Sequence, residues 1–299
     1  MRNPEHLLAK QPLFNQHVRL QTHHLSTYHF SSIFLWQDFF EFEFELIEDS
    51  LCIFARQKGS CFLYLPPLSV AHKHAVVETC FAKMNKVNPR TARIENIEQN
   101  HLDFFEGSFK VYSKLEEYVY EKQALMELKG QAYKSQRHDI HHFQAHQEAL
   151  FRPYEQTDLK ACLSLYESWA KSRHDKHEDD VYRCMLQENR ITHELAFIYH
   201  EALGLNGYVV EVEGKIAAYS FGYSLNCDTF CVLLEIIDIN TTGLAAFIFN
   251  RVCSEEKLRP YRFINTMDDF GMPFVAASKQ AYHPTKRPVS HTITLKNPA

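Results

Sequence analysis

The chain has 299 residues, of which 45% are apolar, and a net charge of −5. This length and apolar content predict a folded protein with one large domain or two ordinary ones. The acidic balance argues against bulk nucleic-acid binding, for which a basic surface is expected. The 9 glycines argue against glycine-rich phosphate loops, and eight cysteines without a CxxC pair indicate neither a zinc ribbon nor a thioredoxin motif.

The composition also bears on the expected location. No apolar run approaches the roughly 20 residues that cross a bilayer, so no transmembrane segment is predicted. The polar start lacks the hydrophobic region of a signal peptide. Scattered cysteines are most simply free thiols of a reducing compartment, and we expect a cytoplasmic protein.

The first half is predicted to be rich in strands. Residues 1–32 suggest a short helix and a connection, and 33–36 form a brief apolar patch. Residues 40–45 alternate phenylalanine and glutamate, which indicates a strand with one buried face. Composition and turn residues predict further strands at 51–55, 61–65, 93–97, 109–112 and 118–120, and helices at 71–84 and 101–105.

The segment 125–143 is basic and rich in histidine. Its helical composition after Gly130 predicts a helix over about 130–145 that connects two domains. We therefore expect an N-terminal domain at 1–145 and a C-terminal domain at 146–299.

The second half is predicted to begin with helices at 158–171 and within 178–200. Strands follow at 208–212, 216–223 and 229–238, with a hairpin turn at Glu213-Gly214. Thr241 or Thr242 is suited to cap a helix that ends near Cys253. The remaining chain predicts a strand at 261–264, an acidic turn, a helix at 276–282 and a final strand at 289–295.

Both halves contain the order β, β, β, α, β, α, β, which suggests a structural duplication. The order resembles the GNAT acyltransferase fold, in which a mixed sheet splays open between its fourth and fifth strands. The predicted fold class is therefore α/β (an α+β mixed sheet) with two tandem GNAT-like domains. Fold alone does not establish function.

Three stretches carry a more specific resemblance: Leu65-Pro66-Pro67-Leu68, the midpoint run 130–143 with Gly130, Tyr133, Arg137, Ile140 and Phe143, and the stretch 264–284 with Asn265, Asp269, Lys279, Tyr282 and Pro284. Together they resemble the family of the C-terminal domain of bacterial phosphatidylglycerol lysyltransferase, over about 34–284. Fem-type peptidyltransferases are similar in using two GNAT-like domains with aminoacyl-tRNA. The resemblance implies transfer of an acyl or aminoacyl group to an amine or hydroxyl.

Such transfer needs a proton acceptor and donors for the developing oxyanion. Strand ends of open sheets tend to bind ligands. The expected catalytic residues are Glu235 and Asp269, at adjacent strand ends, and Lys279 and Tyr282, on one face of the following helix. The expected substrate-binding residues are Asn265, Asp268, Tyr133 and Arg137. Simpler roles stay open for these side chains: helix capping for the two aspartates, a solvated Lys279, a packed Tyr282 ring and an interdomain salt bridge of Arg137.

The sequence also departs from the family pattern. Asn265 is followed by Thr266 and Met267 where the family commonly has Arg and Glu, and on the preceding strand Leu233 and Ile236 flank the one retained acidic residue, Glu235. The alternative is therefore a non-catalytic protein that binds a small molecule, tRNA or a protein. The membrane part of the lysyltransferase is absent from this sequence, so a lipid acceptor is not indicated.

The donor and any cofactor are less specified. Aminoacyl-tRNA or acyl-CoA would serve as donor, with a small-molecule acceptor as partner. A CoA pyrophosphate needs a glycine-rich turn at a helix N-terminus. The turn after the predicted strand 229–238 contains one glycine, Gly243, and is a poor match. No metal site is predicted, because the HxxH at His174 and His177 is unremarkable in a chain with 18 histidines.

Overall fold

The structure is a computed structural model that describes residues 4–174 and 180–296. Contacts divide the chain into two compact units. The first unit comprises Met1–Tyr118, Met267–Ala277 and Lys286–Ala299, and the second comprises Val119–Thr266 and Ser278–Thr285. Each unit is built on one six-stranded mixed sheet.

The first unit holds the sheet with strand order β1-β2-β3-β4-β12-β5. Only β3 and β4 run parallel, and their pairing is limited to Leu63 and Ile94. The bounds are β1 Glu41–Ile47, β2 Ser50–Gln57, β3 Ser60–Leu63, β4 Ile94–Glu98, β5 Phe109–Glu116 and β12 Val289–Leu295.

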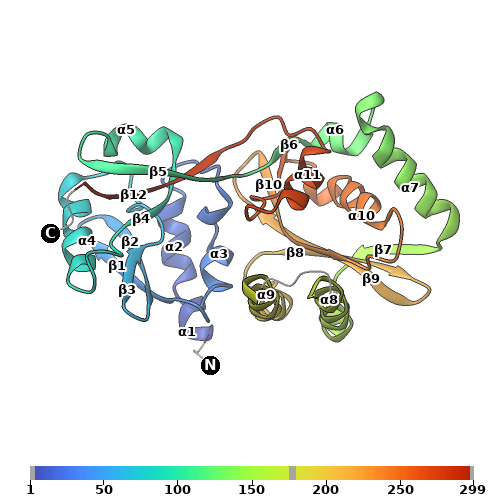
Figure 1. The fold of residues 1–299 in the computed structure, drawn as a ribbon, viewed down its shortest axis with the longest axis horizontal. Coiled ribbons are helices and arrows are strands. Elements are labelled where there is room, and N and C mark those ends of the chain that lie inside the picture. Colours follow the sequence, from blue (N-terminus) through green and yellow to red (C-terminus); the bar gives the residue numbers. More distant parts are fainter. Residues whose placement is uncertain (1–3, 175–179, 297–299) are drawn as a thin grey trace. The chain divides into compact units, whose positions relative to one another are not determined.

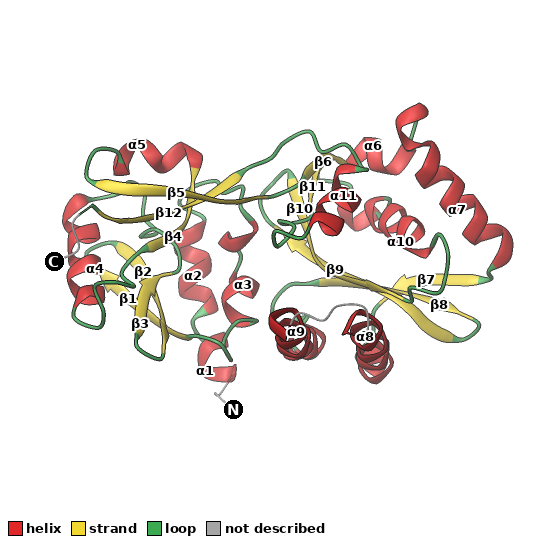
Figure 2. Ribbon diagram, viewed as in Figure 1, coloured by secondary structure: helices red, strands yellow, loops and turns green. Residues whose placement is uncertain are grey.

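Helices of the first unit cover this sheet (Figures 1 and 2). They are α1 Pro4–Leu8, α2 Gln11–Val18, α3 Phe30–Phe34, α4 His74–Asn85 and α5 Leu102–Phe105. Helix α4 packs against β3 and α2 packs against β2. Strand β2 is buried along its first six residues, so both of its faces are covered, and its sequence is continuously apolar from Leu51 to Ala55. The core is largely aromatic and aliphatic, and it includes Phe54, Ile97, Phe105 and Ile293.

The second unit holds the sheet with strand order β6-β11-β10-β9-β8-β7. The bounds are β6 Val119–Glu121, β7 Ala149–Pro153, β8 Asn206–Val212, β9 Lys215–Ser224, β10 Thr229–Ile237 and β11 Phe263–Asn265. The helices are α6 Lys122–Glu127, α7 Lys134–His146, α8 Leu159–His174, α9 Asp180–Ile198 and α10 Leu244–Cys253, while α11, Pro273–Gln280, has residues of both units. Helices α8 and α9 cover one face of this sheet, and α10 with α6 and α7 covers the other (Figures 1 and 2).

Two strands are exchanged between the halves of the sequence. The predicted strand at 289–295 forms as β12, but it lies in the first sheet between β4 and β5. The predicted strand at 118–120 forms as β6, but it pairs with β11 in the second sheet. The division into units therefore differs from the predicted boundary at residue 145. Alternation of apolar residues identifies a strand and its buried face, but it carries no information about which sheet the strand joins.

The predicted connecting helix is α7, and it packs against α10 inside the second unit. The predicted hairpin turn is confirmed, because Glu213 and Gly214 both have positive φ, as a tight two-residue hairpin requires. The helix expected at 276–282 begins earlier, at Pro273, and ends at Gln280. Proline favours the first helical turn, which explains the earlier start.

The second sheet splays open beside β10. Strand β11 pairs in parallel with β10 only from Thr229 to Cys231. Within the described residues, the rest of β10 up to Ile237 has no partner strand on that side. A β-bulge between Val232 and Leu234 marks the point of departure, and bulges often re-aim side chains next to active sites.

Gly243 precedes α10 and has a left-handed backbone with φ of 82°. A Cβ at this position would collide with the backbone carbonyl of Asp139 in α7. We expect Gly243→Ala to lower the free energy of unfolding by about 2–3 kcal/mol, because backbone strain and overpacking add. Gly214→Ala is the matched control, since Gly214 is also left-handed but has open space around it. It should cost about 1 kcal/mol in the same urea denaturation experiment, and equal losses for the two variants would contradict the packing of α7 on α10.

Candidate active site

The candidate active site lies at the splayed end of β10 in the second unit. Glu235 follows the bulge and stands opposite Ser220 of β9. The residue is partly accessible, but its carboxylate atom Oε2 is buried and accepts no hydrogen bond from a described residue. A buried carboxylate oxygen without a bonded donor is costly, and such a cost commonly marks a functional site.

Burial raises the pKa of Glu235 to about 7. The Ser220 hydroxyl and the Lys279 ammonium act in the opposite direction, because each stabilises the carboxylate. A carboxyl group whose pKa lies near neutrality can accept a proton from a nucleophile and return it within one turnover. The environment of Glu235 therefore fits a general base.

Lys279 and Tyr282 belong to the same unit as Glu235. The Lys279 ammonium donates a hydrogen bond to the carbonyl of Thr266, directly after β11. The Tyr282 ring packs edge-on against Phe249, with ring centroids 5.0 Å apart. Burial, followed by the charges of Glu235 and Cys253, raises the Tyr282 pKa, so its phenol stays protonated and keeps a hydrogen to donate. Glu235 thus interacts electrostatically with both side chains.

The two aspartates belong to the first unit, whereas Glu235, Lys279 and Tyr282 belong to the second. The Tyr118 hydroxyl donates to Asp269 Oδ2 over 2.6 Å, and the Gly271 amide donates to Asp269 Oδ1 over 2.9 Å. Asp268 accepts a hydrogen bond from the Phe270 amide over 2.9 Å. Both carboxylates therefore order the turn before α11 through bonds to amides two residues on. Both amides precede α11, which begins at Pro273, so these bonds are turn bonds and not helix caps. Within a single unit, the structure does not bring Asp269 together with Glu235.

The predicted substrate-binding residues Arg137, in α7, and Tyr133, directly before it, bond to the backbone. The Arg137 guanidinium donates to the carbonyls of Leu128 and Gly130. The Tyr133 hydroxyl donates to the carbonyl of Tyr282 over 3.3 Å, and Gln136 donates to the carbonyl of Ala281 over 2.8 Å. Helix α7 therefore fixes the segment that carries Tyr282. Gln136 was missed in the sequence because an amide on a helix face has no distinguishing pattern.

The remaining predicted positions are distributed as follows. Asn265 is fully buried at the end of β11. Ile236 is buried in the core, whereas Leu233 is half-buried in the bulge. Thr266 contributes its carbonyl to Lys279, and Met267 has a left-handed backbone with φ of 61° in the first unit. The HxxH run at 174–180 lies largely outside the described residues.

Comparisons with known proteins agree with this architecture. A family model described as "Phosphatidylglycerol lysyltransferase, C-terminal" matches residues 18–291. No curated protein sequence matches the chain significantly. A conserved protein of unknown function from Bacteroides thetaiotaomicron is 22% identical, has a TM-score of 0.86, and the match covers 97% of each chain.

Two further solved structures extend the comparison. The C-terminal domain of a putative lysylphosphatidylglycerol synthetase from Agrobacterium fabrum is 13% identical, with a TM-score of 0.66 over 98% of this chain and 93% of that one. A tandem GNAT protein from the clavulanic acid biosynthesis pathway is 8% identical, with a TM-score of 0.53 over 98% and 97%. The predicted tandem GNAT-like fold is therefore confirmed. Among the described helices, none has the length and apolar character to span a membrane.

Proposed function

The chain belongs to the family of the phosphatidylglycerol lysyltransferase C-terminal domain, and from this premise we propose that it transfers an aminoacyl group to an amine or hydroxyl acceptor. The observation that carries the proposal is Glu235. Its carboxylate is buried at the splayed end of β10, has a pKa of about 7, and interacts with Lys279 and Tyr282. A charged group is maintained here at a cost to stability, which is expected of a catalytic base.

The chemistry assigns one task to each side chain. The acceptor amine or hydroxyl attacks the carbonyl carbon of the aminoacyl ester, and Glu235 takes the proton that the nucleophile loses. The Tyr282 hydroxyl and the Lys279 ammonium donate hydrogen bonds to the oxyanion that develops on the carbonyl oxygen. The ester bond then breaks, and the proton held by Glu235 passes to the departing ribose oxygen of the tRNA. The products are the aminoacylated acceptor and uncharged tRNA.

The second unit favours aminoacyl-tRNA over acyl-CoA as the donor. A CoA pyrophosphate would sit against free amide groups at the N-terminus of the helix that follows the splayed strand. That helix is α10, and the Asp139 carbonyl of α7 is in close contact with Gly243 at its N-terminus. A carbonyl oxygen this close to the helix N-terminus would repel phosphate oxygens. We therefore propose aminoacyl-tRNA as the donor, with acyl-CoA as the less favoured alternative.

A thermal-shift and transfer experiment tests the proposal. The melting temperature should rise by a few degrees with a saturating aminoacyl-tRNA, because ligand at 100 times its Kd adds about 2.7 kcal/mol. Uncharged tRNA and acetyl-CoA should give smaller shifts. Loss of radiolabelled amino acid from the tRNA should accelerate when a pool of amine and hydroxyl acceptors is added.

The competing function is binding without transfer. The half-buried Leu233 in the bulge favours it, because an apolar side chain at this point supplies contact surface but no chemistry. A shift with charged tRNA but no acceptor-dependent loss of the amino acid would support this function and contradict transfer. A shift with acetyl-CoA alone would contradict the proposed donor.

A further inference from the structure

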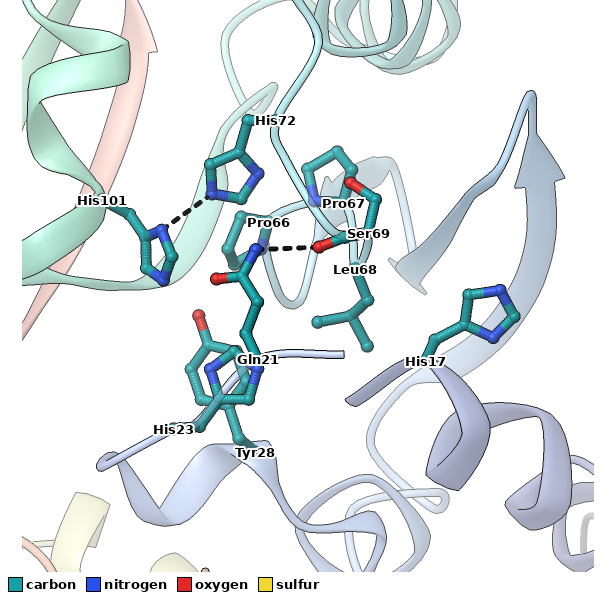
Figure 3. A pocket seen from close by; sticks show the side chains of 10 residues that line it. All are labelled: His17, Gln21, His23, Tyr28, Pro66, Pro67, Leu68, Ser69, His72 and His101. Atoms are coloured by element: carbon teal, nitrogen blue, oxygen red, sulfur yellow. Dashed lines mark hydrogen bonds between the residues drawn. The ribbon is translucent and has the colours of Figure 1, made fainter. Parts of the chain in front are cut away.

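A second polar site lies in the first unit, where β3 and β4 separate after their single pair of residues. The chain leaving β3 forms a small pocket with the loop before α3 (Figure 3). Its lining includes His23, Tyr28, Pro67, His72 and His101. In Figure 3 the rings of His72 and His101 point toward each other, and His23 lies against Tyr28.

Glu98, the last residue of β4, stands behind two of these imidazoles. His23 Nδ1 lies 2.9 Å from Glu98 Oε2, and His101 Nε2 lies 3.8 Å from the same oxygen. Their potential ligand atoms all lie within 4.8 Å of one another, and no other group of this kind occurs among residues 4–174 and 180–296. We propose that His23, Glu98 and His101 bind a divalent transition-metal ion of the zinc class.

The distances suit such an ion. Zinc–nitrogen and zinc–oxygen bonds of about 2.0–2.2 Å place tetrahedral ligands about 3.4 Å apart. The separations of 2.9 and 3.8 Å lie on either side of this value. The 3.8 Å interval between His101 and Glu98 is too long for a hydrogen bond. The ligand atoms of the third pair, His23 and His101, lie within 4.8 Å of each other and need to approach by little more than about 1 Å. Two imidazoles and one carboxylate favour zinc or a neighbouring transition metal over magnesium or calcium.

Neighbouring groups hold each ligand in position. His72 Nε2 lies 3.2 Å from His101 Nδ1, so His101 can donate there while its Nε2 faces Glu98. His23 stacks on Tyr28 with centroids 3.9 Å apart, and Tyr28 is anchored by its hydroxyl to the Asn96 carbonyl over 2.8 Å. Such outer contacts fix the tautomer and orientation of metal-ligating histidines.

Glu98 is oriented equally firmly. Its Oε1 accepts hydrogen bonds from the amides of His24 and Leu25, which leaves Oε2 facing the imidazoles. Glu98 is only 3% exposed, and a buried carboxylate requires a compensating positive charge. Three protein ligands with a pocket on one side leave a coordination position for water or a further ligand, as in catalytic rather than structural zinc sites.

The simpler explanation is a hydrogen-bonded core in which Glu98 ties the 23–25 loop to β4. A metal titration separates the two. The full chain, treated with a chelator and dialysed, is titrated with Co²⁺ while visible absorption is recorded, and bound Co²⁺ is then displaced with Zn²⁺. One equivalent should give a nitrogen- and oxygen-ligated spectrum without the thiolate band that cysteine ligation would produce, and Zn²⁺ should raise the melting temperature.

Variants locate the site. His101→Ala should weaken the affinity for the bound Co²⁺ ion at least about 100-fold, and His72→Asn should weaken it about 10–100-fold. Glu98→Gln tests the carboxylate; if it fails to fold, the His101 variant still decides. The matched control is His142→Ala with His146→Ala, because these stacked imidazoles on α7 are a pair of neighbouring histidines in the second unit. This double variant should still bind one Co²⁺ ion with the affinity of the wild type.

Two results would overturn the proposal. One is the absence of a single saturable equivalent for Co²⁺ and Zn²⁺ in the wild-type chain. The other is a metal ion that His101→Ala still binds with unchanged affinity, or that the double variant on α7 no longer binds. Either would leave the cluster as a hydrogen-bonded core.

Discussion

Replacing Glu235 by glutamine is expected to slow transfer strongly and, at the same time, to stabilise the protein at pH 8. Glutamine keeps the size of the side chain but cannot accept a proton. Removal of a general base typically costs a factor of about 10²–10⁴ in rate. We therefore expect kcat to fall at least about 100-fold, with donor binding largely retained, in an assay of acceptor-dependent aminoacyl transfer.

The stability change follows from the raised pKa. In the folded protein the pKa of Glu235 is about 7, above its ordinary value of 4.5. Folding therefore favours the protonated form of Glu235. Its contribution to the free energy of unfolding is fully present below about pH 4.5 and is lost as the pH rises through 7. Glutamine stays neutral and avoids this loss. At pH 8 the variant should gain up to about 3 kcal/mol in the free energy of unfolding, and the gain should vanish near pH 4.5.

Glu201→Gln serves as the control, since Glu201 is an exposed carboxylate of the same unit. It should change neither transfer nor the pH dependence of unfolding. An active Glu235→Gln enzyme would exclude Glu235 as the base. A variant without the gain at pH 8 would show that the carboxylate is not buried as described.

The second large effect concerns the exchanged strand. Ile293 in β12 is fully buried in the core of the first unit. Truncating a buried isoleucine to alanine removes contacts and leaves a cavity, and typically costs 2–5 kcal/mol. We expect Ile293→Ala to cost about 3–5 kcal/mol and to accelerate amide hydrogen exchange in β4 and β5, its neighbours in the sheet.

Exchange in β8, β9 and β10 should change much less, because these strands belong to the second unit. Ile293→Val, which deletes one methyl group, should cost about 0.5–1.5 kcal/mol with the same pattern of protection. If Ile293→Ala instead accelerated exchange chiefly in the second sheet, β12 would belong to that sheet and the observed strand exchange would be wrong.

Local patterns predicted most of the elements correctly. The strand expected at 229–238 is β10, the helix expected to end near Cys253 is α10, and the hairpin turn lies at Glu213-Gly214. These features depend on period and turn residues, which neighbouring residues encode. The cap expected from Thr241 or Thr242 is wrong, because the N-cap of α10 is Gly243, which has no side chain to cap the helix. The sheet to which a strand belongs depends on long-range packing, and for that reason the destinations of β6 and β12 were not predictable.

The candidate site was predictable in part for the same reason. The strand and helix patterns located Glu235, Lys279 and Tyr282, and the structure brings them into one unit. Asp269 appeared equivalent in sequence, but its role depends on Tyr118, a residue 151 positions away. The residues His23, Glu98 and His101 likewise come from distant segments, so no local sequence motif predicts the cluster.

The pH–rate profile of aminoacyl transfer tests the central claim most directly. It is measured from about pH 5.5 to 8.5 with a no-enzyme control for ester hydrolysis. A Glu235 base with a pKa of about 7 predicts a rate that rises roughly tenfold per pH unit below 7 and levels off above it. A profile that is flat across this range, or that is unchanged in Glu235→Gln, would contradict catalysis by Glu235 at the splayed end of β10.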